Sequence, residues 1–315
     1  MSKPILVGYD PQTRDRAPVL FGVAAARFTG APLIVASVCA GSPIIDSLPA
    51  GYGSEELLSH ATEALEPLSR ELDVEGVRVE YRELESTSAP RGLHEAAERE
   101  GAGLLVVGST GRGAVGRVLP GSTAERLMHG SPSAVAVVPH GWEAGGGLHT
   151  IGVAYADTDE AREALRGAHA LALRAGATLR VLTVVKLHLG MYGETEAATA
   201  EQRGKGFEEV EGEHRVRAEA ALRSAVAELD GGVEMTVDAF VEDPADTLVR
   251  VSANLDLLVC GSRGYGPLRA VLLGGVSRRV VAEAHCPVIV LPRGVEAPLE
   301  ALTTEGAGAS APPTD

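Results

Sequence analysis

The chain has 315 residues, of which 45% are hydrophobic and only 3% aromatic, and its formal net charge is −15. This length suits two domains of about 150 residues, each large enough to bury its own core. The negative charge argues against general binding to nucleic acid or to anionic membranes, because both surfaces attract basic proteins.

The start of the chain enters a strand pattern at residues 5–9 and leaves no room for a signal peptide. No apolar run approaches the ~20 residues that span a bilayer. The three cysteines never form a C-x-x-C pair, which is typical of reduced thiols. They are Cys39, Cys260 and Cys286. We therefore expect a soluble, cytoplasmic protein with no membrane partner.

Strand and helix patterns alternate along both halves, as they do in βα units. In the first half, strands are predicted at 5–9, 33–38, 77–84, 104–107 and 134–138, with helices at about 55–72, 90–99 and 122–129. In the second half, strands are predicted at 151–155, 179–185, 235–240, 257–260 and 288–291. The fold class is therefore α/β, with two tandem doubly wound domains, each a five-stranded parallel sheet flanked by helices.

The two halves are copies of one unit. Ile5–Tyr9 and Ile151–Tyr155 match at an offset of 146, whereas glycine-rich segments further on match at 153. The second copy therefore carries seven extra residues, which we place around 190–213. Such self-similarity indicates a duplicated domain. The predicted domains are 1–141 and 148–294, with a linker at 141–147 and a disordered tail at 295–315 that is rich in Ala, Gly, Thr and Pro.

A glycine spacing, G-x2-G-x9-G, follows an apolar run in each half. It begins at Gly108 in the first copy and at Gly261 in the second. A backbone without Cβ can take φ > 0 and lets a phosphate approach its N–H groups. In an open α/β sheet, a ligand binds beyond the carboxyl ends of the strands, where the strand order reverses. If the first and fourth strands are neighbours, that point brings Asp10 and the loop 108–122 together.

Plainer interpretations of these residues stay open. Ser122 opens a sequence that is also a capping box, and Arg112 could be a solvated loop residue rather than a phosphate ligand. Residues 111–116 match G-x-G-x-x-G, but they follow the fourth strand, so no dinucleotide cofactor is predicted. The histidines have no metal-ligand spacing, and no residue has the pattern of a nucleophile or a general base. We expect no metal site and no catalytic residue.

With these motifs the chain resembles a tandem universal stress protein over about residues 3–293. Nucleotide-binding members of that family carry G-x2-G-x9-G-[S/T], and an aspartate ends their first strand in the pattern V-x-x-D. The resemblance implies an adenine-nucleotide alpha-hydrolase-like fold that binds ATP, with or without Mg²⁺. The phosphates would lie on 111–123 and the adenine near Asp10 and Val38. The implied nucleotide-binding residues are Asp10, Val38, Gly108, Gly111, Arg112, Gly113, Gly121, Ser122 and Thr123.

The second copy departs from the family pattern. Gly275 stands where the first copy has Ser122, and Ala156 stands where it has Asp10, with Asp157 one place later. Loss of one charged hydrogen bond costs about 1.5–3 kcal/mol, or one to two decades in affinity. We therefore expect the stronger site in the N-terminal half. The residues of the weaker or vacant site are Gly261, Gly264, Gly274, Gly275, Val276 and Ser277.

The function predicted first is that of an ATP-binding, nucleotide-responsive stress and regulatory protein with an unidentified protein partner. A slow ATPase or ATP-dependent enzyme on the same scaffold stays open, with Asp10 as a metal ligand. A structural interaction protein that binds no nucleotide is the third alternative. The resemblance also implies pairing through the last strands, either between the two halves or in a homodimer.

Overall fold

A computed structural model of the protein describes residues 2–40, 65–109, 122–186, 207–261, 274–291 and 299–303. The first half contains β1 (Ile5–Gly8), α1 (Ala17–Thr29), β2 (Leu33–Ala40), β3 (Val79–Ser86), α3 (Ala89–Glu100), β4 (Leu104–Gly108), α4 (Ser122–Met128) and β5 (Ala134–Val138). A helical segment at 65–71 precedes β3. The second half contains β6 (Thr150–Ala154), α5 (Asp159–Ala175), β7 (Thr178–Val185), α7 (Phe207–Ala227), β8 (Met235–Val241), α8 (Pro244–Ser252), β9 (Leu257–Gly261), α9 (Gly275–Glu283) and β10 (Val288–Leu291), followed by α10 (Glu300–Thr303).

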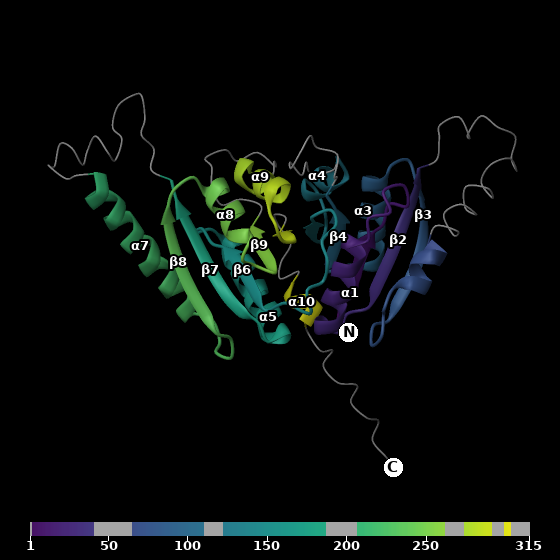
Figure 1. The fold of residues 1–315 in the computed structure, drawn as a ribbon, viewed down its shortest axis with the longest axis horizontal. Coiled ribbons are helices and arrows are strands. Elements are labelled where there is room, and N and C mark those ends of the chain that lie inside the picture. Colours follow the sequence, from purple (N-terminus) through teal and green to yellow (C-terminus); the bar gives the residue numbers. More distant parts are fainter. Residues whose placement is uncertain are drawn as a thin grey trace, which may run out of the picture.

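The described strands form a single ten-stranded sheet in the order β3-β2-β1-β4-β5-β10-β9-β6-β7-β8 (Figure 1). Neighbouring strands are parallel within each half. In each half the strand order reverses beside the first strand, which is the doubly wound arrangement. The predicted α/β fold with two tandem five-stranded units is confirmed.

The two halves meet where β5 pairs antiparallel with β10, and we call this pair of strands the seam. The paired residues are Val135 with Val290, Ala136 with Ile289 and Val137 with Val288. The pairing of the last strands that the resemblance implied is therefore present within the chain. It turns two five-stranded sheets into one.

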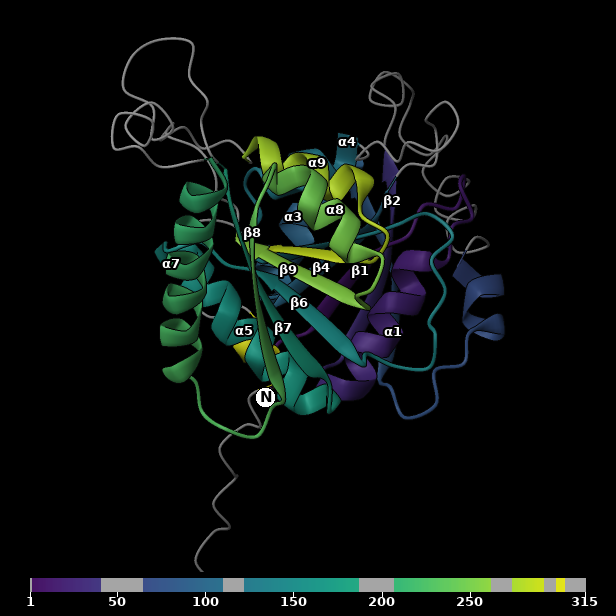
Figure 2. The ribbon, with the colours of Figure 1, turned by 60° about the vertical axis from the view of Figure 1, so that its left-hand side comes forward.

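Helices cover both faces of this sheet, and the hydrophobic core on each face runs through both halves. One face packs against α1, α5 and α10, and the other against α3, α4, α8 and α9 (Figures 1 and 2). Because side chains alternate along a strand, Ala136 and Ile289 lie in the first core, and Val135 and Val290 lie in the second. The halves therefore share their cores across the seam.

The extra residues of the second copy lie between β7 and β8, as predicted. Leu33 faces Val79 in the first half, and Leu179 faces Met235 in the second. Leu33 and Leu179 are 146 positions apart, whereas Val79 and Met235 are 156 apart. At β4 the offset is 153, as between Leu104 and Leu257. The insertion is thus longer than predicted, and three residues are lost before β9.

The prediction of a disordered tail over 295–315 is wrong for residues 299–303. Leu299 and Leu302 are 0% and 1% exposed, and the backbone N–H of Lys3 donates to the carbonyl of Ala301 at 3.2 Å. Leu299 packs over Gly167 of α5, and Leu302 packs beside Gly103 of the first half. Two leucines three residues apart share one face of a helical turn, so even this short segment buries apolar surface. It joins the halves on the face of the sheet that carries α1 and α5.

We predict that Leu302→Ala lowers the free energy of unfolding by about 2–3 kcal/mol, because it leaves a cavity between the halves. Urea denaturation followed by circular dichroism measures this loss. Leu173→Ala is the matched control, since Leu173 of α5 is 52% exposed and should cost less than about 1 kcal/mol. Equal losses for the two variants would contradict the assignment of residues 299–303 to the core.

Candidate functional site

The carboxyl ends of β1 and β4 lie side by side at the point where the strand order of the first half reverses. Val7 pairs with Val106, so the chain leaves the same edge of the sheet at Asp10 and at Ser109. The structure therefore brings Asp10 and Gly108 to one edge, as the sequence predicted. Open α/β sheets bind ligands at this position.

Asp10 is exposed and shapes the turn that follows β1. Its Oδ1 accepts a hydrogen bond from the backbone N–H of Gln12 at 2.9 Å. Its backbone carbonyl accepts from the hydroxyl of Thr13 at 3.1 Å and from the N–H of Arg14 at 3.2 Å. These bonds hold the carboxylate at the edge of the sheet, where it can accept further hydrogen bonds from a base or a ribose.

Val38 lies near the end of β2, the strand beside β1, and is half-buried. A Cβ added to Gly92 of α3 would come within 2.9 Å of its Cγ1, so this valine packs directly on the helix. Val38 therefore lies at the same edge of the sheet as Asp10. Its predicted place beside an adenine stays a prediction.

The glycine motif of the first half reaches the described residues only at its two ends. Gly108 ends β4, and a Cβ there would lie 3.0 Å from Cγ of Pro18, so a side chain has little room. Ser122 and Thr123 open α4 at the other end of the motif. Residues 110–121 lie outside the described part of the chain, and so do these predicted site residues: Gly111, Arg112, Gly113, Gly121 and, in the second copy, Gly264.

A cluster that the sequence analysis missed lies beside Gly108. The Asp15 side chain is 9% exposed, and its Oδ2 is 3.0 Å from Nδ1 of His140. Its Oδ1 accepts from the N–H of Ala17 at 3.1 Å and of Gly141 at 3.3 Å. The hydroxyl of Ser109 accepts from the N–H of His140 at 2.9 Å. His140 and Gly141, at the start of the linker between the halves, are thus hydrogen-bonded to residues beside the end of β4.

One sequence signal pointed to half of this cluster. Aspartate is common at the start of helices, and Asp15 stands just before Arg16, the N-cap residue of α1. Its contact with His140 spans 125 positions, which no local pattern reveals. The cluster ties α1, the end of β4 and the linker into one unit.

The equivalent edge of the second half is built differently. Asp157, the expected substitute for Asp10, forms an ion pair with Arg162. Ser277 of α9 is buried, and its hydroxyl donates to the carbonyl of Gly261 at 3.3 Å. A Cβ on Gly261 would lie 3.2 Å from the carbonyl oxygen of Glu160. The polar side chains of this edge are therefore largely occupied by contacts within the protein.

Gly274 is the N-cap residue of α9, and no side chain caps this helix. Gly275 follows as its first residue, with open space around the position of a Cβ, and Val276 is half-buried against the second core. The start of α9 therefore has the glycine backbone of the motif but lacks the hydroxyl that Ser122 supplies in the first half.

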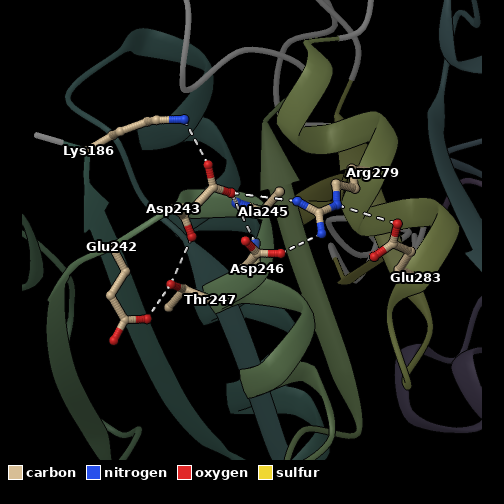
Figure 3. A network of polar contacts seen from close by, with 8 residues as sticks. All are labelled: Lys186, Glu242, Asp243, Ala245, Asp246, Thr247, Arg279 and Glu283. Atoms are coloured by element: carbon tan, nitrogen blue, oxygen red, sulfur yellow. Dashed lines mark hydrogen bonds and ion pairs between the residues drawn. The ribbon is translucent and has the colours of Figure 1, made fainter. Parts of the chain in front are cut away.

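A network of ion pairs covers the ends of β7 and β8 in the second half (Figure 3). Asp243 caps α8, accepting from the N–H of Ala245 at 3.1 Å and of Asp246 at 3.3 Å. Nζ of Lys186 donates to Asp243 at 2.8 Å. Arg279 of α9 pairs with Asp246 and lies 3.4 Å from Glu283. In the first half Ala40 stands at the position of Lys186, so the pair between Lys186 and Asp243 has no counterpart there.

This network shifts the ionisation of its acids. The hydrogen bond from Lys186 is the main cause that holds the pKa of Asp243 below its usual value. Hydrogen bonds from Thr247 and Arg250 lower the pKa of Glu242 in the same way. Cations of the protein itself therefore already engage both carboxylates, with Lys186 on Asp243 and Arg250 on Glu242.

Two of the cysteines, Cys260 and Cys286, are buried. Burial raises the pKa of Cys260 to about 12 and raises that of Cys286 as well, which disfavours their thiolates. Among the described residues, no three of the types His, Cys, Asp and Glu gather in a way that could hold a metal ion. No helix in the described ranges is both long enough and apolar enough to cross a bilayer.

Comparisons with known proteins agree on one family. The model described as the Universal stress protein family matches residues 1–139 and 147–292. A universal stress protein of Mycolicibacterium smegmatis is 30% identical over 303 residues, which cover 91% of this chain and 96% of the relative. One from Mycobacterium tuberculosis is 28% identical over 297 residues, covering 91% and 99%.

A solved structure has the same overall fold. The crystal structure of a universal stress protein from Archaeoglobus fulgidus aligns with a TM-score of 0.64 at 20% identity and covers 92% of this chain and 96% of that one. At this identity the likeness concerns the fold alone. It extends over both halves of the chain.

We predict that Asp243→Asn lowers the melting temperature at neutral pH. Asparagine keeps the helix cap but removes the charge that Lys186 stabilises. A carboxyl whose pKa is lowered on folding stabilises the protein above its unfolded pKa of about 3.9, and this contribution is lost as the pH falls through the folded pKa. The difference from the parent protein should therefore be full above about pH 5 and shrink towards zero as the pH falls through the lowered pKa of the folded state.

Thermal unfolding between pH 2 and pH 8 measures this difference. Glu143→Gln in the exposed linker is the control for a simple loss of one negative charge. A constant difference for Asp243→Asn across the whole range would contradict the role of the ion pair.

Proposed function

The chain belongs to the universal stress protein family, with one family domain in each half, and we propose that it is an ATP-binding member whose N-terminal half holds the stronger site. In this proposal the protein is a nucleotide-responsive regulatory protein of the stress response. The ligand is ATP, with or without Mg²⁺, and the responding partner is a protein still to be identified.

The observation that carries the proposal is the position of the glycine motif on the sheet. Gly108, Gly111, Gly121 and Ser122 complete G-x2-G-x9-G-S in the first half. The described ends of the motif leave β4 and enter α4 at the edge where Asp10 also ends its strand. Loop N–H groups and the Ser122 hydroxyl would bind phosphates, and Asp10 would accept hydrogen bonds from the nucleoside.

The carboxyl ends of β1 and β4 form the first edge, and those of β6 and β9 form the second edge. The contrast between these two edges supports a single strong site. The second half has lost the Ser122 hydroxyl and the Asp10 carboxylate to Gly275 and Ala156. Its hydroxyl at Ser277 is bonded within the protein, and Asp157 is paired with Arg162. ATP there would lack two ligands that the first half offers.

Binding at the first edge has a route to the rest of the chain. Ser109, inside the motif, holds the N–H of His140, and Asp15 holds that of Gly141. His140 and Gly141 belong to the segment that leads into the second half. A ligand that binds the folded protein at 100 times its dissociation constant also adds about 2.7 kcal/mol of stability. Occupancy of the first edge would therefore stabilise the fold together with these contacts at the start of the linker.

We predict that Gly121→Val reduces ATP affinity at least tenfold, because a branched side chain would fill the space that a phosphate needs. Isothermal titration calorimetry measures the affinity. The matched control is Gly274→Val at the equivalent position of the second copy, which should keep the affinity of the parent protein. Circular dichroism establishes that both variants are folded.

The reverse pattern, with loss of binding only in Gly274→Val, would contradict the assignment to the first half. If both variants bind ATP as tightly as the parent protein does, the site does not involve the glycine motif at all. An assay for released phosphate in the same samples distinguishes a binding protein from a slow ATPase.

A further inference from the structure

The seam lies on an approximate two-fold axis that relates the two halves. From β4 onwards, equivalent positions of the two copies are 153 residues apart, as Gly108 and Gly261 show. Ala136 and Ile289 are equivalent by the same offset, and they pair with each other. A residue that pairs with its own equivalent lies on the axis. The axis therefore passes between Ala136 of β5 and Ile289 of β10.

The two residues on the axis differ in size. Ala136 is 0% exposed and Ile289 1%, and both lie in the core on the α1 and α5 side of the sheet. Residues directly opposite each other in an antiparallel pair have Cβ atoms about 4.5–5.5 Å apart, so their sizes must fit. If the first halves of two chains paired through β5, alanine would face alanine and leave a void. If the second halves of two chains paired through β10, isoleucine would face isoleucine and overpack the core.

A second pair on the opposite face of the sheet differs in charge. Glu125 of α4 and Arg278 of α9 are also equivalent by the offset of 153, and NH1 of Arg278 lies 4.0 Å from Oε1 of Glu125. The two helices lie side by side over the seam (Figure 1). Two first halves would bring two carboxylates together here, and two second halves would bring two guanidinium groups together. Both arrangements are repulsive.

We propose that the seam selects an unlike half: the surface made by β5 and α4 accepts the surface made by β10 and α9 and rejects a copy of itself. The flanking contacts, Val135 with Val290 and Val137 with Val288, are the same in every pairing, so selection falls on the axis pair and the ion pair. This selection acts without nucleotide. It concerns the choice of partner surface and goes beyond the proposed function.

Such selection has a consequence for assembly. Each chain carries both surfaces. If like surfaces paired, the first half of a chain would bind the first half of a neighbouring chain, and its second half would bind a second half in the same way. Contacts of this kind join separate chains into an oligomer. Complementary surfaces within one chain instead satisfy each other and leave no seam surface exposed.

The test recreates the like-with-like contacts inside the full-length chain. Ala136→Ile produces the isoleucine pair of two second halves, and Ile289→Ala produces the alanine pair of two first halves. Each variant should melt about 5 °C or more below the parent protein. The swapped variant Ala136→Ile/Ile289→Ala should regain more than half of the summed loss, because one large and one small side chain again meet on the axis.

The matched control combines Ile289→Ala with Ala31→Ile. Ala31 is 3% exposed in the same core, but it lies just before β2, which β1, β4 and β5 separate from β10 in the sheet. This combination should regain nothing. A swapped variant whose loss equals the sum of the two single losses, or a control that regains as much, overturns the proposal.

The charge pair provides the same test on exposed side chains, should Ala136→Ile fail to fold. Glu125 and Arg278 are 41% and 63% exposed, so Glu125→Arg and Arg278→Glu should each lower the melting temperature by only about 1–3 °C. The double reversal should return it to the parent value. Glu125→Arg combined with Arg279→Glu is the control, because Arg279 pairs with Asp246 instead. Additive losses in the double reversal overturn the proposal in that case.

Discussion

The antiparallel pairing of β5 with β10 is the interaction on which the rest of this structure depends. It joins two doubly wound sheets into one, so that β3 and β8 alone are edge strands among the described elements. Both hydrophobic cores continue across it. Contacts on the two faces reinforce it, with Leu299 and Leu302 on one side and the pair Glu125–Arg278 on the other. Each half covers the last strand of the other, so the duplicated domains share one sheet and both cores.

Within this body the two carboxyl edges have diverged. The first edge keeps the aspartate after β1 and the glycine motif with its serine, and its linker contacts run through Asp15 and Ser109. The second edge keeps the glycine spacing but fills its polar positions with contacts of its own, most clearly between Lys186 and Asp243. The proposed nucleotide site in the first half alone rests on this difference between the two edges.

Strands and topology were predictable because buried parallel strands appear in the sequence as short apolar runs. β4 and β9 fall within one residue of their predicted bounds for this reason. The place of Asp10 followed from the reversal of strand order. The helical turn at 299–303 was missed because two leucines in a stretch rich in Ala, Gly and Pro give no periodic signal. The contacts of Asp15 with His140 and of Lys186 with Asp243 join residues far apart in sequence, and only the fold brings them together. Gly111 and Gly121 lie outside the described residues, so their roles stay predictions.

The stoichiometry of ATP binding tests the central claim most directly. Protein stripped of nucleotide is titrated calorimetrically with ATP and Mg²⁺ at several temperatures, so that binding with little heat at one temperature is still detected. One site per chain is the result that the account predicts, since the second edge lacks both the hydroxyl and the aspartate of the first. Two equal sites per chain would contradict the division between the edges, and no binding at any temperature would contradict the nucleotide site itself.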